Sequence, residues 1–449
     1  MKQNKKNDID MLNGPLAMKI LMFALPLAAS SILQQLFNSI DVAVVGRFAS
    51  SQALAAVGSN GPVISLLINL FLGISMGANV IISNHIGQKD NNSIHDAINT
   101  VAVVALWGGI FLMFLGIAVA RPILEMMDTP HDVIEMAVLY LRIYFVGIPF
   151  FLIFNFGSAI LRSMGDTRRP LYILVVAGIV NTLLNLLFVI CFGMGVAGVA
   201  VATDIANAIS AILIVVLLLH EKEPYRLELK KMKIHGNELR RMVQIGVPAG
   251  VQGMIFSFSN VLLQATINGY GSAAVAGSAA ALNFEYYCYF MISAFNGAAI
   301  SFIGQNYGAG KNDRVRRVFG LCMIMSVVFC GALNWIFIWQ QDFFVGLFTT
   351  VPVVHHYAYI RMDIVLATQA IACSYEIAGS SLRGMGISLL PTLLTVVGTC
   401  FLRIGWIYLV CPNHPGFDNL LIVYPVSWVI TGTLMLSAYA LKTRRLLAS

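Results

Sequence analysis

Long apolar blocks alternate with short polar segments along the whole chain. Each block is about 20 residues or longer, which is the length that a helix needs to cross a bilayer. Within a block the apolar positions are continuous, whereas the strands of a membrane barrel would alternate apolar and polar positions. The pattern predicts twelve membrane-spanning helices, at residues 16–45, 53–83, 97–120, 133–158, 170–191, 196–219, 242–267, 274–303, 318–340, 353–379, 388–410 and 420–441.

The composition favours an all-α polytopic membrane protein. Hydrophobic residues make up 58% of the chain and charged residues 11%, whereas soluble proteins carry about 25% charged residues. The net charge of +7 could indicate nucleic acid, but the order of the spans places 22 of the 28 basic residues on one side of the membrane, Lys2, Lys5 and Lys6 among them. The positive-inside rule then predicts a plasma (inner) membrane protein with both termini cytoplasmic and no bound nucleic acid.

A short phrase occurs twice in the sequence. "LRSMGDTRRP" begins at residue 161 and "LRGMGISLLP" at residue 382, 221 positions later. "YLRI" and "YIRM" repeat at a similar separation. Each half contains six spans, and because six is even, the second half begins on the same side of the membrane as the first. We therefore expect two parallel six-helix lobes around a central cavity. The expected parts are an N-lobe at 1–220, a basic cytoplasmic linker at 221–241 and a C-lobe at 242–449.

The sequence lacks motifs for ATP hydrolysis and for catalysis. It contains no GxxxxGK[ST] phosphate-binding loop, so the chain carries no ATPase of its own. Neither GxGD nor HExxH occurs, and the histidines fall in loops or at the ends of spans. Two parallel lobes joined by one linker are typical of secondary transporters. We therefore expect gradient-driven transport by rocking of the lobes, without enzyme activity and without a cofactor.

Asp41 is the most prominent ionisable residue within the predicted spans. It lies six residues before Arg47, which is roughly 9 Å below the outer surface at about 1.5 Å per residue. Gln34, Asn38 and Asp41 recur at helical spacing and share one helix face. An acid in the membrane is costly and marks a functional site, and desolvation favours the neutral form of a carboxylate. We expect Asp41 to bind and release a coupling ion; a structural, hydrogen-bonded aspartate is the alternative.

Other polar residues of the first half lie at a similar depth. Asn181 and Asn185 are one helical turn apart, and Asp204 lies about eight residues into the next span from the same side. Thr203 and Asp204 are about 100° apart around their helix, so both cannot point squarely into one cavity, and the sequence leaves open which one does. Pro26 removes a backbone hydrogen bond from the first span and is a candidate hinge.

The second half places acids beside aromatic residues. Glu285 and Tyr286 belong to the stretch "NFEYYCYF", and an acid among aromatic rings suits an organic cation; plain packing is the alternative. Asp363 is expected to pair with Arg361 or with another buried base. The candidate substrate contacts of the whole chain are Gln34, Asn38, Asn155, Glu285, Tyr286 and Glu376.

The chain resembles the MATE (multidrug and toxic compound extrusion) family over nearly its whole length. The resemblance lies in "IDVAVVGR", "ILRSMGDTRRP", "NTLLNLLFVICFGMGVAGVAVAT", "IGQNYGAGK" and "SSLRGMGISLLP", in this order. It implies export of amphipathic, usually cationic, organic compounds in exchange for H⁺ or Na⁺. It also implies that the family's first-helix aspartate is Asp41, its hinge proline Pro26, its fifth-helix asparagine Asn181 and its sixth-helix threonine Thr203.

One position departs from the family pattern. Many members carry a second carboxylate four residues after the fifth-helix asparagine, where this chain has Asn185. Our hypothesis is that Asp204 supplies the second carboxylate from the neighbouring helix. The span at 242–267 contains no acid, which disfavours a Na⁺ site in the C-lobe and leaves Asp41 as the position where Na⁺ would bind.

A flippase for lipid-linked oligosaccharides or lipids, of related architecture, is the alternative function. Such flippases tend to have more spans and a basic cavity, whereas the cavity candidates here are acids and amides. The expected partners are small organic cations and membrane lipids, and the protein is expected to be a monomer.

Overall fold

The computed structural model of the protein describes residues 9–127 and 129–446, without the side chains of Ser51 and Arg445. Lys2, Lys5 and Lys6, which the sequence assigns to the cytoplasmic side, lie outside these residues. All regular structure in the described residues is helical, and they contain no strand. The predicted all-α class is therefore confirmed.

Packing divides the chain into two compact units. The first contains Ile9, Asp10 and Ala29–Met254; the second contains Met11–Ala28 and the described residues from Ile255 onward. Two long helices, α1 (Leu16–Phe48) and α8 (Gly236–Asn268), are therefore each divided between the units. The sequence-based prediction divided the two lobes at the linker and did not include this exchange of half-helices between them.

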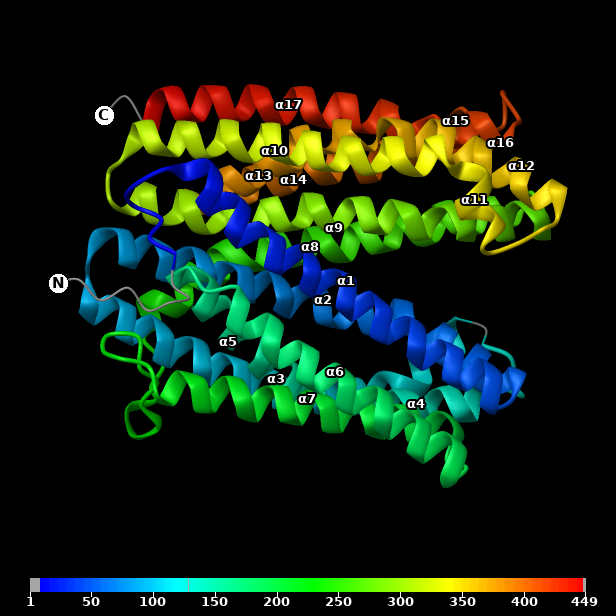
Figure 1. Ribbon diagram of the computed structural model, residues 1–449, viewed down its shortest axis with the longest axis horizontal. Coiled ribbons are helices and arrows are strands. Elements are labelled where there is room, and N and C mark those ends of the chain that lie inside the picture. The colour runs from blue at the N-terminus through cyan, green and yellow to red at the C-terminus, as the bar shows by residue number, and fades with distance from the viewer. Residues whose placement is uncertain (1–8, 128, 447–449) are drawn as a thin grey trace. The chain divides into compact units, whose positions relative to one another are not determined.

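The first unit is organised around a central helix, α5. Besides its parts of α1 and α8, the unit contains α2 (Ser51–Gln88), α3 (Asn91–Met126), α4 (Ile134–Val146), α5 (Ile148–Met164), α6 (Arg168–Leu186), the π-helical turn η1 (Leu187–Cys191), α7 (Gly195–Leu219) and the 3₁₀ turn η2 (Leu229–Lys231). α5 packs against α2, α3 and α7, and Figure 1 shows α3, α5 and α7 running side by side. α4 and α5 form one span that bends by 47° at Gly147.

Glycines explain why the start of α8 belongs to the first unit. Gly73 and Gly77 in α2 contact the α8 segment that holds Gly246 and Gly250, and each pair is four residues apart. A Cβ atom built on Gly73 would lie 2.3 Å from the backbone nitrogen of Gly250, and one on Gly246 would lie 2.4 Å from Cα of Ile74. The two backbones are in direct contact, as in the small-xxx-small helix pairs of membrane proteins. We call these four glycines the glycine seam.

The second unit holds the start of α1 against α9. Its further elements are α9 (Ser272–Gly308), α10 (Asn312–Trp339), α11 (Gln341–Gly346), α12 (Pro352–Arg361), the π turn η3 (Met362–Leu366), the 3₁₀ turn η4 (Gln369–Ala372), α13 (Cys373–Gly384), α14 (Leu389–Thr395), the π turn η5 (Val396–Phe401), α15 (Leu402–Leu409), α16 (Phe417–Leu421) and α17 (Val423–Leu446). The rings of Phe23 and Phe302 meet edge to face with centroids 5.5 Å apart. Asn306 Nδ2 also donates a hydrogen bond to the Met11 carbonyl at 3.1 Å.

Eleven of the twelve predicted spans have a counterpart in the described chain. Ten helices are long and apolar enough to cross a membrane, and the bent pair of α4 and α5 is the eleventh. The predicted span at 353–379 is interrupted instead, because η3 and η4 separate α12 from α13. This stretch contains Arg361, Asp363 and Glu376, charged residues that lower its hydropathy.

Both copies of the repeated phrase end one helix and begin the next. In the first copy α5 ends at Met164, and Gly165 follows with a φ of +100°. In the second copy Gly386, two residues after the end of α13, has a φ of +84°. The left-handed region favours glycine, so these residues terminate their helices. Pro170 and Pro391 are then the third residues of α6 and α14.

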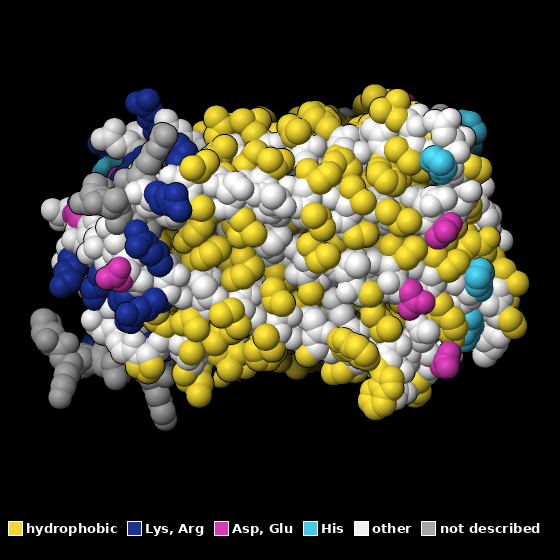
Figure 2. All heavy atoms as spheres, turned by 90° about the horizontal axis from the view of Figure 1, so that it is seen from above, with side chains coloured by type: hydrophobic (Ala, Val, Ile, Leu, Met, Phe, Trp, Pro, Cys, Tyr) yellow, Lys and Arg dark blue, Asp and Glu magenta, His cyan; other side chains and the backbone are white. Residues whose placement is uncertain are grey.

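Polar and apolar side chains are segregated along the helices. On the face shown in Figure 2, Lys and Arg side chains gather at one end of the helices and hydrophobic side chains cover the helix sides. On α3, for example, Trp107, Phe111 and Phe114 are 63%, 61% and 65% exposed. Aromatic side chains in such a stripe are stable against lipid rather than against water. The chain is a multi-pass membrane protein.

Candidate functional site

A close contact between α1 and α6 positions the candidate ion-coupling residues. A Cβ atom built on Gly178 of α6 would lie 1.8 Å from the ring of Phe37 on α1, so a larger residue would collide with this ring. Asp41 follows Phe37 by about one helical turn, and Asn185 follows Gly178 by about two turns. The contact therefore brings Asp41 beside Asn185.

Four side chains from three helices form one hydrogen-bonded chain, which we call the Asp41 network: Asp41, Asn185, Asn181 and Thr203. Asn185 Nδ2 donates to Asp41 Oδ1 and to Asn181 Oδ1 at 3.2 Å. Asn181 Nδ2 donates to Thr203 Oγ1 of α7 at 3.3 Å. The Thr203 hydroxyl donates to the Val199 carbonyl of its own helix at 3.0 Å. The network ties α1, α6 and α7 together at one level of the first unit.

Asp41, Asn181 and Asn185 of the Asp41 network are buried, and the network has one open acceptor. Asp41 is 9% exposed, Asn181 6% and Asn185 0%. Within the described residues, Asn185 Oδ1 is buried and has no hydrogen-bond partner. A buried carboxylate beside amide and hydroxyl oxygens can bind a proton, and the same oxygens are ligands that suit a hard metal cation. These residues can therefore hold either H⁺ or Na⁺.

Asp204 lies at the bend between α4 and α5. A Cβ atom built on Gly147 would lie 1.9 Å from Asp204 Oδ1, so the carboxylate packs directly on the backbone of the bend. Its neighbour Thr203 points toward α6 and belongs to the Asp41 network. Of the two neighbours, Thr203 is therefore the one that joins the network. Tyr140 and Tyr144 of α4 stack with centroids 6.1 Å apart.

In the second unit Glu285 belongs to a buried ion pair. Arg361 donates from Nε to Glu285 Oε1 at 2.6 Å and from Nη2 to Oε2 at 3.0 Å. The two residues are 2% and 7% exposed, respectively. Asp363 is exposed, so the alternative in which it pairs with Arg361 is wrong. A two-pronged arginine partner neutralises Glu285, which argues against a role of this carboxylate in binding an organic cation.

The other candidate substrate contacts of the first unit differ in exposure. Gln34 and Asn38 are exposed on α1, about two turns and about one turn, respectively, before the buried Asp41. Asn155 is half-buried, and its Nδ2 donates to a backbone carbonyl of its own helix at 2.9 Å. The polar face predicted for the first span is therefore buried at Asp41 and open at its other two members.

The second unit contains two further candidates and one residue that sequence reasoning did not select. Tyr286 is 43% exposed, and Glu376 accepts a hydrogen bond from Asn296 Nδ2 at 2.8 Å. Arg403 is 1% exposed, and its guanidinium lies over the Tyr424 ring at 4.5 Å from the centroid. An aromatic partner for a buried arginine lies far away in sequence, so it gives no local signal.

The two prolines of the divided helices lie close to the points of division. Pro26 lies inside α1, two residues before Ala28, where the helix passes from the second unit to the first. Pro248 lies inside α8, six residues before Met254, where that helix passes from the first unit to the second. Each proline lacks one backbone hydrogen bond and loosens the helix that joins the units.

Known proteins share both the repeat and the fold. The family model MatE matches the chain twice, at residues 26–187 and 248–409, so the two matches begin and end 222 residues apart. The chain is 27% identical over 382 residues to the "Probable multidrug resistance protein YoeA" of Bacillus subtilis, covering 84% of this chain and 82% of that protein. It is 21% identical over 359 residues to the "Multidrug export protein MepA" of Staphylococcus aureus, covering 79% and 78%.

Solved structures show the same fold. A crystal structure of MATE in the bent conformation matches with a TM-score of 0.92 at 19% identity, over 100% of both chains. The two matches of the family model together cover more than half of the sequence and confirm that its halves are repeats of one another. The chain belongs to the MatE family.

Proposed function

We propose that the protein is a secondary active antiporter that exports amphipathic, cationic organic compounds in exchange for H⁺ or Na⁺. The observation that carries this proposal is the Asp41 network, a shielded carboxylate held by amides in the membrane-spanning part of the first unit. An ionisable residue at such a position is energetically costly, which indicates a functional role. The names of the relatives, multidrug resistance and multidrug export proteins, support drugs as cargo and transport rather than catalysis.

Protonation of Asp41 changes the hydrogen bonds that the Asp41 network can form. An ionised Asp41 accepts the hydrogen bond from Asn185 Nδ2. A protonated carboxyl has an O–H to donate, and a half-turn of the Asn185 amide would present its open Oδ1 as the acceptor. Protonation thus favours one of two hydrogen-bond arrangements between Asp41 on α1 and Asn185 on α6. A cationic cargo would favour the ionised arrangement, and this competition couples export to ion entry.

In the proposed mechanism, the helices that bend are α1 and α8, which are divided between the two units. A rocking motion of the two lobes requires that α1 and α8 bend where they pass from one unit to the other. Pro26 and Pro248 lie two and six residues before these points. We propose Pro26 as the hinge that responds to the Asp41 network, because both lie on α1. We also propose a location in the plasma membrane with cytoplasmic termini, which the distribution of the basic residues favours, and action as a monomer.

Proteoliposomes with an imposed gradient test this function. Purified protein is reconstituted, either a pH gradient or a Na⁺ gradient is imposed, and the movement of a fluorescent organic cation is followed. We expect movement against its concentration gradient with one of the two ions. Asp363→Asn is the matched control, since Asp363 is an exposed acid outside the network, and it should transport as the unmodified protein does. Equal movement with and without both gradients would refute the antiport mechanism.

A further inference from the structure

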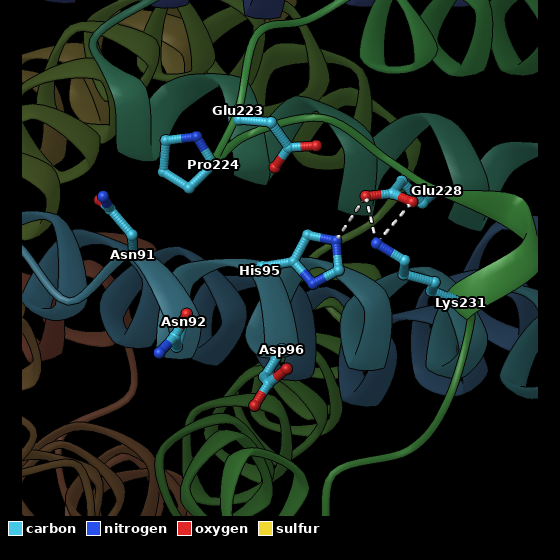
Figure 3. Close-up of a pocket in the computed structure, with 8 residues that line it drawn as sticks. All are labelled: Asn91, Asn92, His95, Asp96, Glu223, Pro224, Glu228 and Lys231. Atoms are coloured by element: carbon cyan, nitrogen blue, oxygen red, sulfur yellow. Dashed lines mark hydrogen bonds and ion pairs between the residues drawn. The ribbon is translucent and has the colours of Figure 1, made fainter.

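A hollow lies between the start of α3 and the segment that joins α7 to α8 (Figure 3). It encloses about 620 Å³ and is lined by Asn91, Asn92, His95, Asp96, Glu223, Pro224, Glu228 and Lys231. Three carboxylates and one lysine give the lining a negative charge, although the joining segment has more basic than acidic residues. All of these residues belong to the first unit. The hollow is therefore negatively charged within a basic segment, and it can attract a cation.

Three metal-binding side chains converge at this hollow. One donor atom each from His95, Glu223 and Glu228 lie within 4.8 Å of one another. His95 Nε2 is 3.3 Å from Glu228 Oε1. Lys231 Nζ bonds both oxygens of Glu228, at 3.1 and 3.0 Å, so that an ammonium group stands where a cation is favoured. Lys231 has a 63% exposed side chain, and an exposed pair of this kind is weak enough to be displaced.

A buried amide behind His95 can fix the imidazole for metal binding. Asn99 is 1% exposed, and its Oδ1 has no hydrogen-bond partner in the described chain. Its Nδ2 lies 3.0 Å from His95 Nδ1 and 3.3 Å from Nε2. A half-turn of the Asn99 amide exchanges the positions of its oxygen and its nitrogen. Asn99 Oδ1 then accepts a hydrogen bond from His95 Nδ1–H, as the second partner of a metal-binding histidine usually does. The lone pair of His95 Nε2 is left free to bind a metal ion beside the two glutamates.

We propose that His95, Glu223 and Glu228 bind a divalent transition-metal ion, which displaces Lys231 and ties the segment between α7 and α8 to α3. One imidazole nitrogen and two carboxylates are a donor set that suits Zn²⁺ and its neighbours in the first transition row, with water completing the coordination. Mg²⁺ and Ca²⁺ prefer oxygen donors alone and are disfavoured here. The ion would join the connection between the two repeats to a helix of the first.

Titration of Zn²⁺ into the full-length protein tests the site. The protein is purified in detergent without an oligohistidine tag, and binding is followed by calorimetry or by competition with a fluorescent chelator. We expect one ion per chain. His95→Ala and the double variant Glu223→Gln/Glu228→Gln should each weaken binding about 100-fold, since even outer-shell partners contribute about 10- to 100-fold. His131→Ala, an exposed histidine outside the hollow, is the matched control and should bind as the unmodified protein does.

Lysine variants separate a metal site from a purely structural ion pair. Lys231→Ala removes the competing ammonium and should tighten Zn²⁺ binding, whereas Lys230→Ala, the neighbour outside the hollow, should not change it. Lys231→Ala retains every proposed ligand, so this arm remains informative if His95→Ala fails to fold. The proposal is overturned if His95→Ala binds Zn²⁺ as tightly as the unmodified protein, if His131→Ala loses binding equally, or if Lys231→Ala weakens it.

Discussion

Substitution of Gly73 by alanine should force α2 away from the start of α8. The added Cβ atom would lie 2.3 Å from the backbone nitrogen of Gly250 and 2.5 Å from the carbonyl oxygen of Gly246. Non-bonded heavy atoms in favourable contact are about 3.5–4.0 Å apart. The obstructing atoms are backbone atoms, which cannot turn aside as a side chain can. The two helices must therefore separate by about 1 Å at the glycine seam.

The expected cost follows from two opposing effects. Overpacking of a tight contact costs about 1–3 kcal/mol, while alanine stabilises a helix over glycine by about 1 kcal/mol. Gly58→Ala is the matched control on the same helix, because a Cβ atom built there meets nothing within 4 Å. Gly58→Ala has the same gain in helix propensity as Gly73→Ala but no clash. The difference in the free energy of unfolding between the two variants isolates the clash and should be about 1–3 kcal/mol.

Thermal unfolding in one detergent, followed by tryptophan fluorescence, measures this difference. Gly58→Ala should melt at or above the temperature of the unmodified protein, and Gly73→Ala should melt clearly below Gly58→Ala. Gly246→Ala approaches the Cα of Ile74 at 2.4 Å and should repeat the result from the other helix. If Gly73→Ala and Gly58→Ala melt together, the start of α8 does not rest on α2 as the seam requires.

Three further predictions concern single charged residues. Glu285→Gln leaves the guanidinium of Arg361, 2% exposed, without its counter-ion and should cost about 3–5 kcal/mol; the thermal midpoint measures this, and Glu285→Gln/Arg361→Met should recover much of the loss. Asp204→Asn should alter the pH dependence of transport if Asp204 is the second coupling carboxylate, and an unchanged rate and pH profile would show that it is not. Hydrogen bonds from Ser93 lower the pKa of Asp90 below the ordinary 3.8, so the stabilisation by Asp90 is complete above pH 3.8 and is lost as the pH falls through the lowered value. Asp90→Ala should therefore lower the thermal midpoint at neutral pH, and a difference that persists at the acid end would contradict this.

Features that depend on residues close together in the chain were predictable from the sequence. The apolar blocks indicated the spans because a bilayer imposes one length on every helix. The repeated phrase indicated the two halves, and the family matches at 26–187 and 248–409 confirm them. Helical spacing also placed Asn181 and Asn185 on one face, where a hydrogen bond of 3.2 Å now joins them.

Features that depend on contacts between distant segments were not predictable. The place of the start of α8 in the first unit rests on the glycine seam, and glycines in an apolar helix do not identify the partner that they approach. Arg361 lies two residues from Asp363 but pairs with Glu285, 76 positions away, because helix packing decides which carboxylate it meets. The choice between Thr203 and Asp204 likewise depended on how α7 is rotated against α6. The interrupted span at 353–379 follows from changes of helix type that apolar periodicity does not report.

Gly178 is a small residue whose place in the sequence does indicate a close helix contact. It lies seven residues before Asn185, on the same side of α6, and the helix face that carries Asn181 and Asn185 also carries this small residue. A small residue in line with two buried amides indicates that another helix approaches closely there. The structure shows that helix to be α1, through the ring of Phe37.

Proton counterflow in liposomes tests the central role of Asp41 most directly. Vesicles are loaded with an organic cation and a pH-sensitive dye and diluted into cargo-free buffer, so that outflow of the cargo is the only imposed driving force. With H⁺ as the coupling ion, the unmodified protein should acidify the vesicle interior; with Na⁺, it should instead accumulate the sodium isotope. Asp41→Asn keeps the shape of the side chain and an oxygen for Asn185, and it should remain folded while moving neither ion. Ion counterflow through Asp41→Asn equal to that of the unmodified protein would contradict the account.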